Sequence, residues 1–257
     1  MIKKEEVVVL ANYNAHTYFG MRVLEQLPSN VRRLCAGDMP AFRLGLYGPD
    51  PLIFSLLTKK ISDHLHTHWR TESLPELRRA LQSNDPTARS FAAGYLLHQL
   101  LDDIVHPRIY RWMKMGSSHF RVELALDHLV LRDTKCLNPP RLITYGKERT
   151  AQAAAAMLLP VNAWQYRSGL WRMAQLSEYV RYQVDAEAEH MKELELHRAR
   201  TLRDYMEEGV EAAANELAAS FCIPLNEAEE QQHFELLRSK KLLMKQPKLE
   251  LAHNNLG

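Results

Sequence analysis

Cysteine is scarce in this 257-residue chain: the three that occur, Cys35, Cys136 and Cys222, lie far apart, and no C-x-x-C pair is present. An odd number of widely separated cysteines argues against a disulfide framework and is typical of a reducing compartment. The same scarcity indicates that a bound metal would be held by nitrogen and oxygen ligands rather than by sulfur.

Long apolar runs and an excess of one charge are also missing. The formal net charge is +2, which indicates neither a nucleic-acid-binding surface nor an acidic one. Near the N-terminus Glu5 and Glu6 follow Lys3 and Lys4 at once, and the apolar run 7–11 is too short for the core of a signal peptide. No stretch approaches the roughly 20 apolar residues of a membrane span. We therefore expect a cytoplasmic protein without a transmembrane segment.

Glycine contributes only ten residues, and alternating strand-like patterns are nearly absent; the one short β-branched run, 7–10, is too isolated to make a sheet. Apolar residues recur instead with the period of a helix, so we expect an all-α, multi-helix bundle. Residues 28–51, rich in proline and glycine, are expected to be irregular. Pro107 should end the helix that Asp85 and Pro86 begin. The helices predicted in this half span 17–27, 52–64, 74–81, 86–106 and 118–132.

Composition changes after about residue 145. Residues 148–218 are rich in Ala, Glu, Arg and Met and predict two or three long amphipathic helices, and Pro224 should begin a last one. We expect three parts: a metal-binding core over 1–145, an added long-helix C-terminal portion over 146–240 that packs on this core, and a disordered tail over 241–257.

The candidate chemistry starts with His98, Asp102 and His106, which repeat at four-residue spacing. On a helix this spacing places an imidazole, a carboxylate and a second imidazole along one face. The alternative is a surface helix with ordinary ion pairs. The flanking residues are mostly apolar, however, which indicates a buried helix, and buried polar groups need partners. Zinc takes His nitrogen and carboxylate oxygen, so the pattern favours a metal site.

A second repeat, His119, Glu123 and Asp127, has the same spacing on a similarly apolar segment. The alternative is a helical Glu–His pair. Asp127 is expected to orient a ligand imidazole rather than to bind metal directly.

His16, Asp50 and the His64–His66–His68 stretch are weak signals by themselves. A lone histidine is usually a packed or surface residue, and an aspartate before proline is common in turns. They become candidate ligands only because the two repeats occur in the same chain.

Taken in order, four segments resemble the zinc-dependent phospholipase C family, which is similar to the P1-type nucleases. They are AHTYFG (15–20), GLYGPDP (45–51), GYLLHQLLDDIVHP (94–107) and HFRVELALD (119–127), with the His-rich stretch between the second and third. The resemblance covers about residues 12–132. It implies an all-α fold with zinc ions between helices and the hydrolysis of phosphodiester bonds, in secreted members those of phospholipids.

The resemblance also implies a ligand set. One zinc would be held by Asp50, His66, His98 and Asp102, a second by His106, His119 and Glu123, and a third by His16 together with Asp102. Asp102 would be shared between ions, and Asp50 would orient or deprotonate the attacking water. His66 is preferred to His68 because it follows an apolar residue near the helix end, although the choice stays close to even. In secreted members the mature N-terminal residue is itself a ligand, whereas here His16 lies inside the chain.

The sequence thus predicts a zinc-dependent phosphoester hydrolase with two or three ions, although Mn, Fe or Co suit such ligands too. Its substrate would be a small phosphoester or a lipid headgroup. One alternative is a non-catalytic, metal-stabilised interaction protein, in which every coordination position is closed. A P1-like nuclease ranks lower because little basic, aromatic surface lies near the ligands. HD-type phosphohydrolases are set aside because no His-Asp dipeptide occurs.

Overall fold

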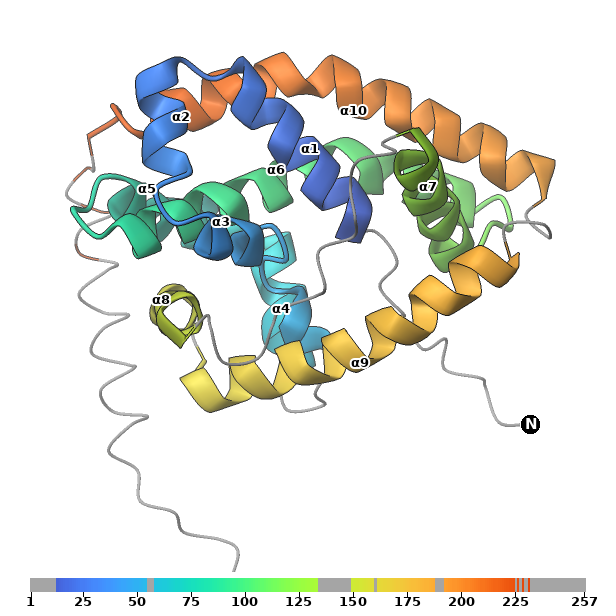
Figure 1. The fold of residues 1–257 in the computed structure, drawn as a ribbon, viewed down its shortest axis with the longest axis horizontal. Coiled ribbons are helices and arrows are strands. Elements are labelled where there is room, and N and C mark those ends of the chain that lie inside the picture. The colour runs from blue at the N-terminus through green and yellow to red at the C-terminus, as the bar shows by residue number, and fades with distance from the viewer. Residues whose placement is uncertain are drawn as a thin grey trace, which may run out of the picture. The chain divides into compact units, whose positions relative to one another are not determined.

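Helices make up all the regular structure that we describe in a computed structural model of the chain (Figure 1), which confirms the all-α expectation. The structure describes residues 13–54, 58–133, 149–159, 161–187 and 192–224, with three single positions beyond them. Contacts divide the chain into two compact units, Met1–Ile223 and Pro224–Gly257, and the elements below lie in the first. They are α1 (Tyr13–Gln26), α2 (Ser29–Cys35), α3 (Met39–Gly45), the 3-10 helix η1 (Asp50–Phe54), α4 (Lys59–Thr67), the π-helical turn η2 (Trp69–Ser73), α5 (Leu74–Leu81), α6 (Pro86–Met113), α7 (His119–Asp133), α8 (Arg149–Leu158), α9 (Ala163–Glu187) and α10 (Glu193–Ser220).

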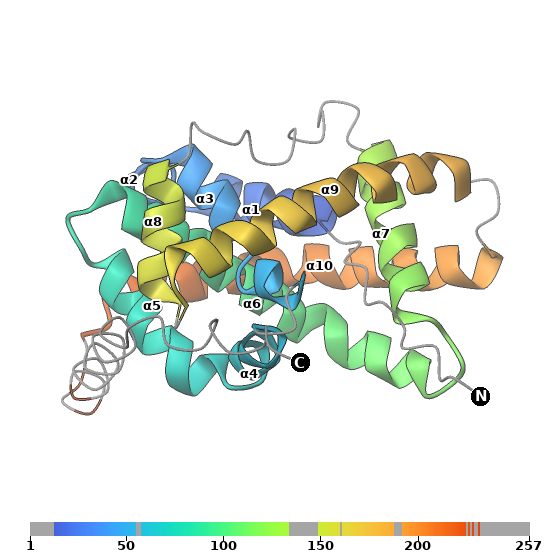
Figure 2. The same ribbon diagram turned by 90° about the horizontal axis from the view of Figure 1, so that it is seen from below.

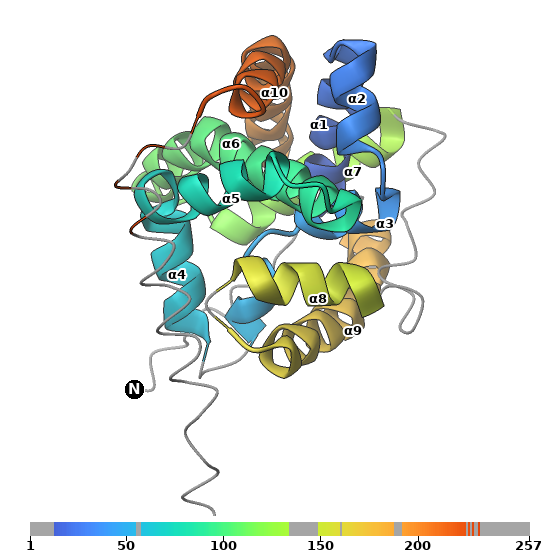
Figure 3. The ribbon, with the colours of Figure 1, turned by 90° about the vertical axis from the view of Figure 1, so that its left-hand side faces the viewer.

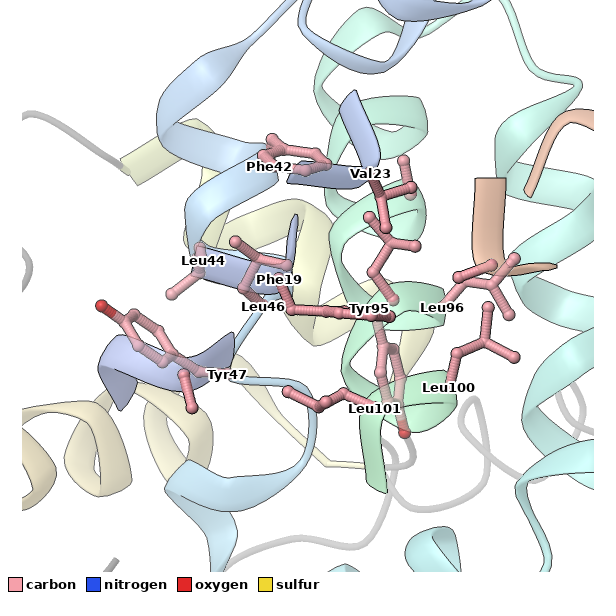
Figure 4. Packing of buried hydrophobic residues seen from close by; sticks show 14 of the residues in the cluster. Phe19, Val23, Phe42, Leu44, Leu46, Tyr47, Tyr95, Leu96, Leu100 and Leu101 are labelled. Atoms are coloured by element: carbon pink, nitrogen blue, oxygen red, sulfur yellow. The ribbon is translucent and has the colours of Figure 1, made fainter. Parts of the chain in front are cut away.

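Helix α6 is the element on which the first unit is built. Asp85 caps its N-terminus by accepting hydrogen bonds from the amides of Thr87 and Ala88, and Pro86 occupies the first turn, where its missing N–H costs nothing. The helix packs against α1, α2, α3, α5, α7, α8 and α10. Figure 4 shows side chains of α1, α3 and α6, among them Phe19, Phe42 and Tyr95, gathered in one apolar cluster. This packing fixes the middle of α6, where the candidate ligands begin.

Two glycines let α3 and α6 approach each other at backbone distance. A Cβ atom on Gly94 would lie 2.1 Å from the Phe42 carbonyl oxygen, and one on Gly45 would lie 2.1 Å from the Phe91 carbonyl oxygen. Side chains at these positions would force the helices apart. The close approach brings the segment after α3, which we call the Asp50 loop and which ends with Asp50 at the start of η1, against α6.

Three expectations for the helices were wrong. Residues 52–64, expected to be one helix, contain the end of the 3-10 helix η1 and, separately, the beginning of α4 at Lys59. Residues 28–51, expected to be irregular, contain α2 and α3. Helix α3 tolerates Pro40 because it lies in the first turn, where the Asp38 carboxylate caps the helix. Helix α6 continues past Pro107 to Met113. Proline has no N–H, so Pro107 cannot donate the helical hydrogen bond to the Asp103 carbonyl. Both residues are exposed, so water can donate to this carbonyl instead.

The C-terminal helices cover the rest of the first unit. Helix α10 packs against α1, α6 and α7, while α9 packs against α8 and η1. Figure 2 turns α9 towards the viewer, and Figure 3 shows α8 and α9 side by side. No helix among the described residues is long and apolar enough to cross a membrane. Four expectations fall on segments that lie wholly or mostly outside the described residues. They are the boundary near residue 145, the run 7–10, the helix from Pro224 and the tail 241–257.

Candidate metal centre

The eight predicted ligands come from five separate elements and meet in three adjacent groups. Five of them lie on α6 and α7, the helices that carry the two sequence repeats. The other three lie on elements that precede α6 in the chain. The eight are His16 on α1, Asp50 on η1, His66 on α4, His98, Asp102 and His106 on α6, and His119 and Glu123 on α7.

The first group joins Asp50, His66 and His98. Asp50 Oδ1 lies 3.0 Å from His66 Nε2 and 3.8 Å from His98 Nε2, and the two Nε2 atoms are 3.3 Å apart. Four ligand atoms about 2.1 Å from a tetrahedral zinc are separated from one another by roughly 3.4 Å. The three ligand atoms therefore already have the spacing that a single zinc ion requires.

The second group joins His16, His98 and Asp102. Asp102 Oδ2 lies 3.2 Å from His98 Nε2, and Oδ1 lies 3.5 Å from His16 Nε2. The two imidazoles stack with their ring centroids 4.3 Å apart. His98 belongs to both the first and the second group, so the two candidate sites are adjacent and have this residue in common.

The third group joins His106, His119 and Glu123 at the junction of α6 and α7. Glu123 Oε1 lies 2.8 Å from His119 Nε2 and 3.5 Å from His106 Nε2. Asp102 Oδ1 is 3.7 Å from His106 Nε2, so the Asp102 carboxylate also links the third group to the second.

The hydrogen bonds of two imidazoles decide which ring nitrogen is available to a metal. His98 Nδ1 lies 3.1 Å from the Leu46 carbonyl oxygen, and His66 Nδ1 lies 2.8 Å from the Ser62 carbonyl oxygen. A carbonyl only accepts, so each Nδ1 carries the proton and donates it. In the neutral rings both Nε2 atoms then point unshared lone pairs at each other and at carboxylates. A cation between them would remove the repulsion between these lone pairs. Metal-bound histidines usually donate their other ring N–H to a carbonyl or carboxylate, as Nδ1 does here.

Asp102 is the second indication of a cation. Its carboxylate is buried, yet neither oxygen has a hydrogen-bond partner of good geometry among the described residues. Burial alone would raise the pKa of Asp102, but the imidazoles of His106 and His98 hold the pKa well below its ordinary value. An ionised, buried carboxylate without hydrogen bonds is expensive unless a positive charge faces it.

The imidazoles around Asp102 respond to their surroundings in opposite ways. Burial and the neighbouring His98 lower the pKa of His16 to about 4, so His16 is neutral at pH 7, as a ligand must be. Burial also acts to lower the pKa of His106, but Asp102 and Glu123 outweigh it and raise this pKa to about 9. Without metal, a proton on His106 therefore supplies part of the positive charge that the carboxylates require, and a bound metal would displace it.

Three residues that the sequence interpretation missed hold the ligands in place. The Ser62 hydroxyl donates to the Pro49 carbonyl, and the main-chain carbonyl of Ser62 accepts from His66 Nδ1, so Ser62 ties the segment before Asp50 to α4. Gly48, at φ +47°, lies so close to the His98 ring that a Cβ atom would be 2.5 Å from it. Tyr166 of α9 donates its hydroxyl to the Gly48 carbonyl at 3.1 Å. Ser62 could have been found from its four-residue spacing to His66, but no local signal marks Tyr166.

Asp127 lies beside the first turn of α1. Its Oδ1 accepts from the Ala15 amide at 3.0 Å, and its Oδ2 accepts from the Asn14 side chain at 3.3 Å. Burial raises the pKa of this carboxyl to about 7. These contacts hold the backbone immediately before His16; that Asp127 orients a ligand imidazole stays a prediction.

The other histidines of the stretch after Asp63 lie outside the three groups. His68 is exposed and stacks on His64 with ring centroids 4.4 Å apart, while His64 pairs with Glu72. Of the two residues between which the sequence left the choice open, the structure thus places His66 beside Asp50 and turns His68 to the surface.

Comparison with known proteins agrees with this geometry. The family model described as zinc-dependent phospholipase C matches residues 15–219, which is more than half of the chain. The chain belongs to the zinc-dependent phospholipase C family. This family is one of zinc phosphoesterases, and the match includes all eight residues of the three groups. It also extends well beyond residue 132, where the sequence resemblance was drawn, and takes in α8, α9 and most of α10. Searches of curated proteins and of solved structures gave no match.

Proposed function

We propose that this protein is a zinc-dependent phosphoester hydrolase that holds two or three zinc ions in the three groups. The observation that carries the proposal is the openness of the centre. Each group offers three protein ligands, and the side chains of His66, His106 and His119 remain 21%, 20% and 23% exposed at its edge. Three protein ligands with an edge open to solvent are typical of catalytic zinc, whereas structural zinc is closed by four.

The roles of the residues follow from their positions. Zinc in such groups would supply charge to a phosphoryl oxygen and lower the pKa of a water molecule. Asp102, which faces the imidazoles of all three groups, is the carboxylate we assign as shared between ions. Asp50 is the first residue of η1 and lies next to the partly exposed His66, and we assign it to orient the attacking water or accept its proton. No side-chain nucleophile is required.

The substrate is part of the proposal. Family membership supports a phosphodiester of the phospholipid type or another small phosphoester, and nucleic acid is not expected. Mn, Fe or Co could replace zinc at these nitrogen and oxygen ligands. We also keep a cytoplasmic location as an expectation, which fractionation of cells that produce the protein would test.

Two measurements on untagged protein test the proposal. Elemental analysis should find two or three zinc ions per chain, and less than one ion per chain would contradict the metal centre. A panel of chromogenic phosphomonoesters and phosphodiesters, including phosphorylcholine esters, should then show turnover that chelation abolishes and zinc restores. Full zinc occupancy without turnover on any member of the panel would favour the metal-stabilised interaction protein instead.

A further inference from the structure

The 3-10 helix η1, which begins with Asp50, has little support of its own. It spans only Asp50–Phe54, and helices this short are not stable by themselves in water. Pro49 and Pro51 on either side of Asp50 have no N–H, so neither residue can donate a backbone hydrogen bond to a neighbouring element. The position of the Asp50 carboxylate must therefore be fixed by the elements that pack on this segment.

Helix α9 contacts both ends of this segment from one face. The buried Tyr166 donates its hydroxyl to the Gly48 carbonyl at 3.1 Å, just before η1. Arg172 donates to the Phe54 carbonyl at 2.7 Å, and an arginine in this place satisfies a carbonyl at the end of a helix. Gly169 lies midway between the two donors, and the three residues share one face because they are spaced three apart. We call these three residues the α9 clamp.

Gly169 brings the backbone of α9 against that of η1. A Cβ atom on Gly169 would lie 2.0 Å from the carbonyl oxygen and 2.7 Å from the carbonyl carbon of Pro51. These are main-chain atoms, which cannot rotate away as the end of a side chain can, so a larger residue would push α9 off η1. Because Tyr166 and Arg172 lie about one helical turn from Gly169, such a displacement would lengthen both hydrogen bonds of the clamp.

We propose that the α9 clamp positions Asp50 in the metal centre, so that its three members are positioning residues. Asp50 Oδ1 lies 3.0 Å from His66 Nε2 and 3.8 Å from His98 Nε2, and such a site tolerates displacements of only about 0.5 Å. The clamp contacts main-chain atoms on either side of Asp50, so it acts through the backbone. The task of Asp50, to orient or deprotonate the attacking water, rests on the proposed function. The third group has no ligand on η1, so only the ion beside Asp50 should respond.

Two substitutions weaken the clamp in different ways. Gly169→Ala separates the two backbones, whereas Arg172→Met removes a donor from an exposed position and should leave the fold intact. Arg172→Lys should keep most of the wild-type behaviour, because an ammonium group can donate to the same carbonyl.

Each substitution has a matched control elsewhere in the chain. Gly209→Ala is the control for the added methyl group, because its Cβ would meet Ile104 Cδ1, the movable end of a side chain, at 2.5 Å. Arg32→Met is the control for the lost donor, because Arg32 donates to the Leu27 carbonyl at 3.1 Å from α2, which carries no candidate ligand.

Amide hydrogen exchange tests the clamp independently of activity. The amides of Gly48, Asp50 and Leu52 lie in the segment, and each donates to the carbonyl three residues before it. In Gly169→Ala and Arg172→Met these amides should exchange about tenfold faster than in wild type, with zinc or with chelator, because a supporting hydrogen bond is worth about that factor. Both controls should exchange as wild type does.

Zinc affinity and turnover then test whether Asp50 depends on the clamp. In competition with a chromogenic chelator, both variants should hold one ion about 10- to 100-fold more weakly and keep the others, as expected when a group that orients a ligand is lost. At saturating zinc, kcat for a soluble chromogenic phosphodiester should fall by about tenfold or more with little change in KM, because Asp50 acts on the attacking water.

The outcomes separate the clamp from the hydrolase proposal. Exchange as slow as in wild type, or zinc affinity unchanged despite faster exchange, would overturn the clamp. A uniform loss of all ions would overturn it too, as would equal losses in the controls or an Arg172→Lys variant as impaired as Arg172→Met. If faster exchange accompanies weaker binding of one ion while wild type turns over no substrate, only the hydrolase proposal is overturned.

Discussion

Substitution of Asp102 by asparagine is the sharpest perturbation of the proposed centre. The Asp102 carboxylate lies 3.2–3.7 Å from the Nε2 atoms of four imidazoles, those of His16, His66, His98 and His106. Asparagine keeps the size of the side chain but removes its charge and replaces one oxygen by an amide group that cannot bind a metal. The variant should therefore fold and lose metal.

The magnitude follows from the number of groups that share this carboxylate. Removal of a residue that only orients a zinc ligand weakens metal binding by about 10- to 100-fold. A shared ligand should cost at least the upper value, so we expect zinc affinity and turnover to fall by about 100-fold or more, which corresponds to about 2.7 kcal/mol.

The matched control is the neighbouring residue on the same helix. Asp103 receives the same substitution, but its side chain is 42% exposed and pairs with Arg70 on the surface. An exposed pair contributes about 1 kcal/mol or less to stability and should not change metal binding. Zinc affinity is measured by competition with a chromogenic chelator and turnover with a chromogenic phosphodiester. Full zinc affinity in Asp102→Asn, or equal losses in both variants, would refute the assignment.

Further predictions concern packing, positioning and protonation. Gly94→Ala should lower the free energy of unfolding by about 3 kcal/mol in a denaturant titration, because its Cβ would meet the Phe42 carbonyl oxygen at 2.1 Å. Tyr166→Phe should lower stability by about 2 kcal/mol and speed the transfer of zinc to a chelator, because the Gly48 carbonyl loses its donor. Chelation should lower the melting temperature by several degrees or more. The pKa of His106 is raised from 6.5 to about 9, so its stabilisation of the metal-free protein is complete below pH 6.5 and is lost as the pH rises through 9. The melting temperature of chelated protein should therefore fall over this range.

Each of these outcomes has a contrary result. Gly37→Ala is the control for Gly94, since the nearest atoms to its Cβ would be at 3.6 Å; equal losses would refute the backbone contact. An unchanged rate of zinc transfer in Tyr166→Phe would show that α9 does not position the Asp50 loop. A melt unaltered after confirmed metal loss would show that the ions are not structural. For chelated protein, a decline between pH 6.5 and 9 that is as steep in His106→Gln as in wild type would assign the effect to other groups.

The sequence by itself determined the features that depend on local periodicity. Four-residue spacing on a helix places residues on one face whatever surrounds it, so the contacts of Asp102 with His98 and His106, and of Glu123 with His119, were foreseeable. The shortage of glycine and of alternating patterns likewise predicted the all-α class. Ordered motifs added the family, although the resemblance stopped short of the C-terminal helices that the family match includes.

Only the tertiary structure decided what joins these repeats. His16, Asp50 and His66 are remote from α6 in the chain, and all three meet it in the structure. Asp50 reaches α6 because Gly45 and Gly94 allow α3 and α6 to touch at backbone distance. No short pattern encodes such a contact. The same is true of Tyr166, which donates to the Gly48 carbonyl from α9, far along the chain from the candidate ligands. Periodicity specifies which face of a helix a side chain occupies, but packing between helices specifies which faces meet, and the centre is built where they meet.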